Sequence, residues 1–173
     1  MIYYLRIIFK ETVFRMVEEF KRALNNVINE NYFGQYLPNV TMHDIQRYKE
    51  PGEGMVIITD FKQPHTRTYS VICIDKLARI IHYCGTDGSI MNNEAFRMLS
   101  ELNDKGHYFR IIQYRYRCKY FHEGFAIYLV DLFTNQMKHF ETFFTHIVPT
   151  DEEIIEMYEL HNLYHHTTRS HRC

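Results

Sequence analysis

Apolar residues recur at helical spacing near the start of the chain. Between residues 11 and 31 the apolar positions Val13, Val17, Phe20, Leu24 and Val27 follow one another at intervals of four, three, four and three. This spacing places them on one face of an amphipathic helix over residues 11–31. Gly34, Pro38 and several Asn and Gln residues follow, so we expect residues 29–39 to end the helix and form a loop.

Four short runs rich in Ile, Val and Tyr predict β-strands. They are Met55–Thr59, Tyr69–Asp75, Arg79–Tyr83 and Tyr108–Tyr114. Only three residues separate the second run from the third, which favours an antiparallel hairpin. Between the third and fourth runs, apolar residues at helical spacing predict a helix over residues 92–103.

The second half of the chain predicts two further helices. Residues 125–133 are apolar at nearly every position, which is typical of a helix buried in the core rather than one lying on the surface. A last helix is expected over about residues 150–164, because Thr150 and Glu153 have the spacing of a capping box. The tail from His165 is polar, and we expect it to be frayed.

Length and composition indicate one globular domain, residues 1–173. The chain is 46% hydrophobic, which is enough for a substantial core. Its 20 Lys and Arg residues are balanced by 21 Asp and Glu residues, so the protein has no overall field that would draw it to nucleic acid or to an anionic membrane. Any binding of that kind would have to be local.

Cysteine usage and the first residues bear on location. The four cysteines are scattered and form no CxxC pair, which favours a reducing compartment over a disulfide scaffold or a zinc ribbon. The apolar run Met1–Phe9 is interrupted by Arg6 and is too short to span a bilayer. It also lacks a signal-peptide cleavage site, so we expect neither a membrane anchor nor secretion.

Two segments carry a resemblance to a known family. The paired runs Tyr69–Asp75 and Arg79–Tyr83, and the later segment Tyr120–Val130, resemble the adenovirus-type (adenain) cysteine proteases and the related SUMO-deconjugating proteases. The resemblance covers about residues 54–133, and less closely 32–38. It implies an α+β, papain-like (adenain-like) cysteine-protease fold, in which a small mixed sheet packs on a buried central helix with flanking helices.

The catalytic positions of that family hold other residues here. The family's His precedes the aromatic residue of the first strand, where this chain has Thr68 before Tyr69. Its Asp closes the second strand, at Cys84, with Asp87 three residues later. Its nucleophilic Cys precedes the glycine that opens the central helix, and Glu123 stands there before Gly124. Its oxyanion Gln falls at Tyr116 or Arg117, and Gln113 comes too early.

These replacements predict a chain that does not cut peptide bonds. A cysteine protease needs a thiolate, a nearby His that takes the proton, and a helix N-terminus that steadies the anion. Glu123 cannot replace the sulfur, although a carboxylate at a helix N-terminus stabilises the helix by about 0.3–1 kcal/mol. The resemblance therefore implies a pseudoenzyme that binds other proteins, among them viral capsid proteins. It also implies a capsid-associated or scaffold role in a virion or the host-cell interior, without a cofactor.

Three alternatives remain open at this point. A displaced thiol site could use Cys118 with His122 or His107, or Cys84 with His82 and Asp87. A nucleic-acid module is indicated by alternating cations and rings, namely Arg110, Tyr114, Arg115, Tyr116, Arg117, Lys119 and Tyr120. The histidines His161, His165, His166 and His171 near the C-terminus raise the question of a metal, but no acidic third ligand accompanies them, so we expect none.

Overall fold

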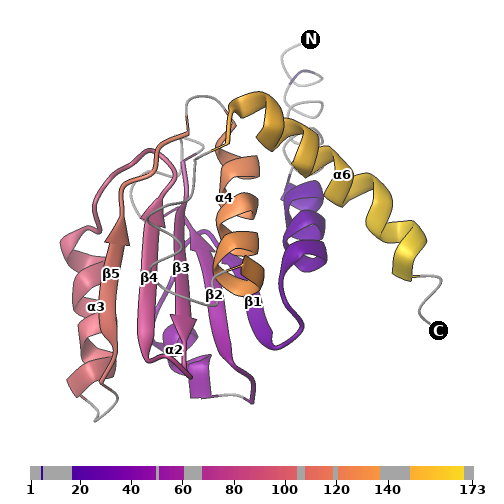
Figure 1. Cartoon of the computed structure of the whole chain (residues 1–173). Helices are drawn as coiled ribbons and strands as arrows, with labels where there is room; N and C mark the ends of the chain where they lie inside the picture. The colour runs from indigo at the N-terminus through magenta and orange to yellow at the C-terminus, as the bar shows by residue number, and fades with distance from the viewer. Residues whose placement is uncertain are drawn as a thin grey trace.

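A five-stranded mixed sheet forms the middle of the molecule (Figure 1). The computed structural model describes Leu5 and residues 17–49, 51–60, 68–104, 108–118, 121–136 and 149–169, without the side chains of 104, 136 and 161–169. The strands are β1 (Tyr32–Leu37), β2 (Gly54–Thr59), β3 (Ser70–Asp75), β4 (Ile80–Gly85) and β5 (Arg110–Tyr114). The named helices are α2 (Met42–Gln46), η1 (Arg47–Lys49), α3 (Asn93–Asp104), α4 (His122–Asp131), η2 (Leu132–Gln136) and α6 (Asp151–Arg169), and a further helix covers residues 17–27.

The strands lie in the order in which they occur along the chain. β2, β3 and β4 are antiparallel to one another, whereas β1 and β5 pair in parallel with β2 and β4 at the two edges. The predicted hairpin is confirmed, with Ser70 opposite Gly85 at its open end. At the closed end the Asp75 carboxylate accepts hydrogen bonds from the amides of Leu77 and Ala78, and Arg79 adopts φ 57°, so four residues suffice to reverse the chain.

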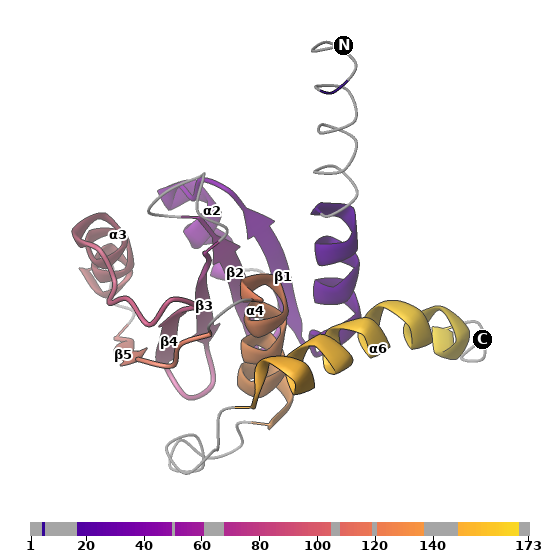
Figure 2. The ribbon, with the colours of Figure 1, turned by 90° about the horizontal axis from the view of Figure 1, so that it is seen from above.

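Helices cover both faces of the sheet, which explains why the central strands are apolar at successive positions (Figure 2). On one face Ile57, Ile72 and Ile81 pack with residues of α2 and α3. On the other face Val56 and Val71 pack with α4, α6 and the helix over residues 17–27. Because side chains alternate between the faces, each central strand contributes to two separate hydrophobic clusters.

Helix α4 lies against the middle of the sheet, as the sequence predicts (Figure 1). Every residue from Gly124 to Val130 is buried, and Phe125, Ile127 and Leu129 have no exposed surface. The helix continues beyond Asp131 into the π-helical turns of η2. Its burial on all sides explains its uniform apolar sequence.

Helix α6 packs across the start of α4. The predicted capping box is present, since the Thr150 hydroxyl accepts from the Glu153 amide and the Glu153 carboxylate accepts from the Thr150 amide. The predicted end near residue 164 is wrong, because the helix continues to Arg169; residues 170–173 of the tail lie outside the described part. No Gly or Pro interrupts residues 151–169, so the backbone has no local reason to stop earlier.

Two predictions near the N-terminus need correction. The first helix ends at residue 27 rather than 31, while residues 11–16 lie outside the described part. The predicted loop over residues 29–39 contains strand β1. Gly34 suggested a turn, but its lack of a side chain instead allows the strand to lie directly against Ile28 and Leu24.

The helical segments α2 and η1 were not predicted. A second capping box, between Thr41 and Asp44, starts α2, and Ile45 and Tyr48 anchor the segment in the core.

Among the described residues, no helix combines the length and apolar character that crossing a membrane requires.

Candidate functional site

The first turn of α4 meets the end of the β3–β4 hairpin at Thr86, which is fully buried. The Thr86 hydroxyl accepts the amide proton of Tyr69 at 2.9 Å and lies 3.0 Å from Nδ1 of His122. Its backbone amide donates to the Tyr69 carbonyl at 2.8 Å, and its carbonyl accepts from the Cys118 amide at 2.9 Å. Thr86 thus ties the hairpin, the segment after β5 and the start of α4 together.

A tyrosine connects Glu123 to the helix over residues 17–27. The Tyr69 hydroxyl donates to Oε1 of Glu123 at 3.3 Å. The Tyr69 ring stacks on Phe20 with 5.2 Å between centroids, and Tyr36 meets both rings edge-on. Burial and the adjacent Glu123 charge raise the pKa of Tyr69, so its hydroxyl remains a hydrogen-bond donor throughout the neutral range.

A second carboxylate, Asp60, lies beside this cluster. Its Oδ2 accepts from the Tyr36 hydroxyl at 2.9 Å, while its buried Oδ1 has no hydrogen-bond partner among the described residues. Burial raises the pKa of Asp60, the hydrogen bond from Tyr36 lowers it, and the negative charge of Glu123 raises it further. Among the described residues, two carboxylates, Asp60 and Glu123, therefore influence each other near the start of α4.

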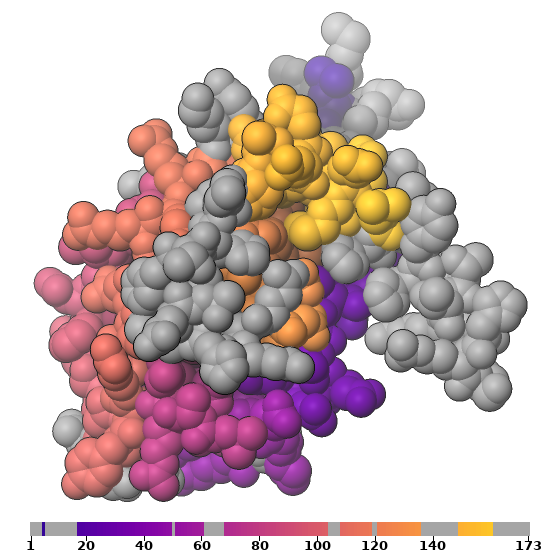
Figure 3. All heavy atoms as spheres, viewed as in Figure 1, coloured from indigo at the N-terminus to yellow at the C-terminus, as the bar shows by residue number. Residues whose placement is uncertain are grey.

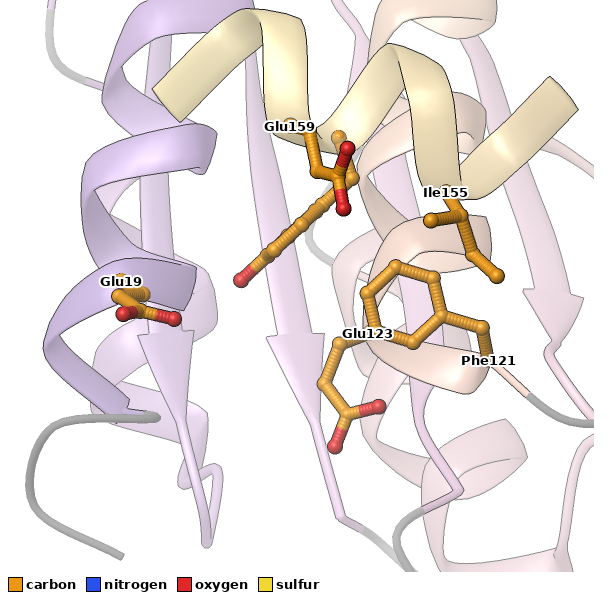
Figure 4. Close-up of a pocket in the computed structure, with 6 residues that line it drawn as sticks. Glu19, Phe121, Glu123, Ile155 and Glu159 are labelled. Atoms are coloured by element: carbon orange, nitrogen blue, oxygen red, sulfur yellow. The ribbon is translucent and has the colours of Figure 1, made fainter. Parts of the chain in front are cut away.

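A hollow of about 240 Å³ opens beside Glu123, between α4, α6 and the helix over residues 17–27 (Figure 4). Three apolar or aromatic side chains line it, namely Phe121, Ile155 and Tyr158. Three carboxylates also line it, namely Glu19, Glu123 and Glu159. In the space-filling view α6 forms the upper part of this face, directly above α4 (Figure 3).

Gly124 allows α4 to start close to α6. A Cβ atom there would lie 2.5 Å from the Phe121 ring and 2.7 Å from Cγ2 of Ile154. Gly124→Ala is therefore expected to lower the free energy of unfolding by about 1–3 kcal/mol through overpacking, although alanine is the better helix former. Chemical denaturation of both proteins measures this, and an unchanged or higher stability would contradict the close contact.

The three described cysteines, Cys73, Cys84 and Cys118, are all buried. Cys84 is fully buried and its Sγ is directed at the carbonyl oxygens of Gly85 and Tyr116, at 3.6 and 3.8 Å. Burial raises its pKa to about 12, and burial likewise raises the pKa of Cys73. The Cys118 thiol is buried too and donates to the Asp151 carboxylate at 3.3 Å.

The histidines proposed to serve these thiols bind elsewhere. Nδ1 of His122 is in contact with Thr86 rather than with Cys118. The His82 ring stacks on Phe133 and shares a 2.7 Å hydrogen bond with the Tyr114 hydroxyl. Burial lowers the pKa of His82 to about 4. His107 lies outside the described residues.

The remaining predicted site residues are spread along one edge of the sheet. Arg110, Arg115 and Arg117 are exposed on β5 and the segment that follows it, and Lys119 lies outside the described residues. Arg117 pairs through its backbone with Asp87. Gln113 accepts the Met91 amide at 2.9 Å, so this side chain holds the loop before α3.

Two further sequence predictions concern the position of Thr68 and a metal site near the C-terminus. Thr68 lies just before β3, next to Tyr69, whose hydroxyl donates to Glu123. In the part of the chain that the structure describes, no group of three or more His, Cys, Asp or Glu side chains is placed to hold a metal ion. The side chains of residues 161–169 and the whole of His171 fall outside that part.

Comparison with known proteins gives matches in structure alone. The SUMO protease Ulp1 with its catalytic cysteine oxidised to a sulfonic acid matches with a TM-score of 0.52 and 14% identity, over 84% of this chain and 73% of that chain. The yeast complex of the Ulp1 protease domain with Smt3 matches with a TM-score of 0.52 and 12% identity, over 83% and 71%. This chain has the fold of Ulp1-like cysteine proteases.

A viral protease with the same fold is also similar. The selenomethionine form of the ASFV protease matches with a TM-score of 0.52 and 16% identity, over 76% of this chain and 60% of that chain. No protein-family model matches the sequence, and no curated protein matches it. The likeness to Ulp1-like proteases therefore concerns the path of the backbone, and the chemistry of this chain has to be argued from its own side chains.

Sequence reasoning did not find Thr86 or the hollow. Thr86 follows from the hairpin register, because pairing of Ser70 with Gly85 places Tyr69 opposite Thr86, but His122 reaches it only through tertiary packing. The hollow joins residues more than a hundred positions apart, Glu19 and Glu123 among them. No local pattern in the sequence carries that information.

Proposed function

We propose that this chain is a catalytically inactive homologue of Ulp1-like cysteine proteases that acts by binding another protein. The observation that carries the proposal is Glu123. It stands immediately before Gly124 in the first turn of α4, where the family resemblance expects the nucleophile, and it holds a hydrogen bond from Tyr69. A carboxylate held in this way stabilises the helix start and supplies no thiolate.

The surroundings of the thiols support the same proposal. Cys84 and Cys118 are buried; the Cys84 thiol is directed at the carbonyl oxygens of Gly85 and Tyr116, and the Cys118 thiol donates to the Asp151 carboxylate. An oxygen acceptor favours the protonated thiol, whereas catalysis needs the thiolate. The alternative of an active protease with a displaced site at either cysteine would require these side chains to rearrange.

We extend the proposal to a viral setting, with a capsid-associated or scaffold role and a partner from the virus particle. The basis is the resemblance of residues 54–133 to adenovirus-type proteases. In such a role the former catalytic end of the fold would serve as a binding surface. This part of the proposal is independent of the chemistry of Glu123.

A cleavage assay tests the proposal. The native protein is incubated with peptide and protein substrates that carry a Gly-Gly sequence at the scissile bond, and the products are read by mass spectrometry. We expect no cleavage above the rate without protein, for the native chain and for Cys84→Ala and Cys118→Ala alike. Cleavage that one of these two variants abolishes, while Cys73→Ala retains it, would establish a displaced active site instead.

A further inference from the structure

The hollow beside α4 combines an apolar floor with carboxylates on its rim. Phe121 and Tyr158 meet edge-to-face with 4.9 Å between centroids, and Ile155 is 41% exposed, so an incoming side chain can reach the apolar floor. Figure 4 shows Glu19, Glu123 and Glu159 contributed by three different helices around it.

The three carboxylates have no cationic partner among the described residues. Lys21, the cation nearest in sequence to Glu19 with a described ion pair, binds Glu18. Carboxylates gathered around one cavity repel each other unless a cation lies between them. The negative charge of Glu123 also raises the pKa of Asp60, whose Oδ1 is buried without a hydrogen-bond partner among the described residues.

We propose that this hollow binds a basic side chain, Lys or Arg, presented by an apolar segment of a partner protein. The inference rests on the proposed function, since it names the chemistry of the partner. The methylene stem of Lys or Arg would lie along Phe121, Ile155 and Tyr158, and its charged head would meet the rim carboxylates. The volume of about 240 Å³ is below the 300–1,000 Å³ that is usual for drug-sized ligands, which favours a side chain over a cofactor.

Binding of a labelled peptide to the full chain tests the inference. The probe is an eight-residue peptide of alternating Leu and Lys, and the control peptide has Glu in place of Lys. Fluorescence anisotropy is expected to show binding of the Lys peptide that weakens as salt is raised, and no binding of the Glu peptide. Absence of binding to the full chain would overturn the inference, and so would equal binding of the two peptides.

Matched variants locate the binding site. The double variant Glu19→Gln/Glu159→Gln removes two exposed rim charges and is expected to weaken binding about 3- to 10-fold. Glu94→Gln/Glu101→Gln makes the same change in net charge on α3, across the sheet, and is expected to change affinity less than about twofold. Equal weakening by both pairs would show that the attraction is general rather than placed at the hollow.

The apolar floor has its own control. Ile155→Ser is expected to weaken binding, whereas Leu77→Ser, at a 76% exposed position in the β3–β4 turn, is expected to leave it unchanged. Thermal unfolding of each variant confirms that it is folded.

Mass spectrometry of the peptide after each titration distinguishes failure of the proposed inactivity from failure of the proposed binding at the hollow. Cleaved peptide would overturn the proposed inactivity and leave the hollow in place, whereas intact peptide without binding would overturn only the hollow.

Discussion

Phe125→Ala is expected to lower the free energy of unfolding by about 3–5 kcal/mol, the range found for large aromatic residues truncated in a core. Phe125 has no exposed surface and belongs to the hydrophobic cluster formed by the sheet, α4 and α6, with its ring 5.8 Å from that of Tyr128. The neighbouring strands and helices are fixed by their own hydrogen bonds, so they cannot collapse into the space left by the ring. Chemical denaturation with a two-state analysis measures the loss.

Phe96→Ala is the matched control. Phe96 lies on the other helical layer, in α3, and its side chain is 51% exposed. The same truncation there is expected to cost less than about 1 kcal/mol, because most of the ring is already in water. Similar losses in the two variants would mean that α4 is not the buried central helix, and the resemblance to the protease fold would lose its main support.

Stability is expected to fall by about 3 kcal/mol as the pH is lowered from about 6.5 to about 4, through His82 alone. Burial lowers the pKa of His82 from 6.5 to about 4 in the folded state. In this window the unfolded chain binds a proton that the folded protein does not, so acid favours unfolding. Above pH 6.5 both states carry a neutral ring and the contribution is complete.

The variant His82→Gln separates the contribution of His82 to the pH dependence of stability from that of carboxylates that titrate over the same pH range. Glutamine can still meet the Tyr114 hydroxyl, which lies 2.7 Å from Nδ1 of His82, but it does not titrate. The variant is expected to lose much less stability between pH 6.5 and 4 than the native chain, whatever its stability at neutral pH. His43→Gln, at an exposed position, should keep the native pH dependence. A wild-type slope in His82→Gln would contradict the buried, neutral ring.

The central strands and α4 could be predicted because they are buried on both sides and consecutive residues in them are therefore apolar. β2, β3 and α4 are covered on both sides, so nearly every position is apolar and the segment stands out. β1 could not be recognised in the same way. It is an edge strand whose residues are mostly half-buried, and its Gly and Gln residues are those of a loop when taken alone.

The candidate site could be predicted only where it is formed by residues that are adjacent in the sequence. The apolar run predicted the buried helix over residues 125–133, and the resemblance to the protease family placed Glu123 and Gly124 at its start. The hydrogen bonds from Tyr69 to Glu123 and between Thr86 and His122 join segments 54 and 36 residues apart. Such contacts follow from the order of strands in the sheet and from how helices pack on it, and neither was available from local spacing.

The measurement that tests the central claim most directly is the reactivity of the cysteines in the native protein. Iodoacetamide labelling is followed over time and resolved for each cysteine by mass spectrometry, in the folded protein and in denaturant. Cys84 and Cys118 are expected to react at least about 100-fold more slowly when folded, because burial and oxygen acceptors disfavour the thiolate. A cysteine that reacts faster in the folded protein than in the unfolded chain would be an activated nucleophile and would contradict the account.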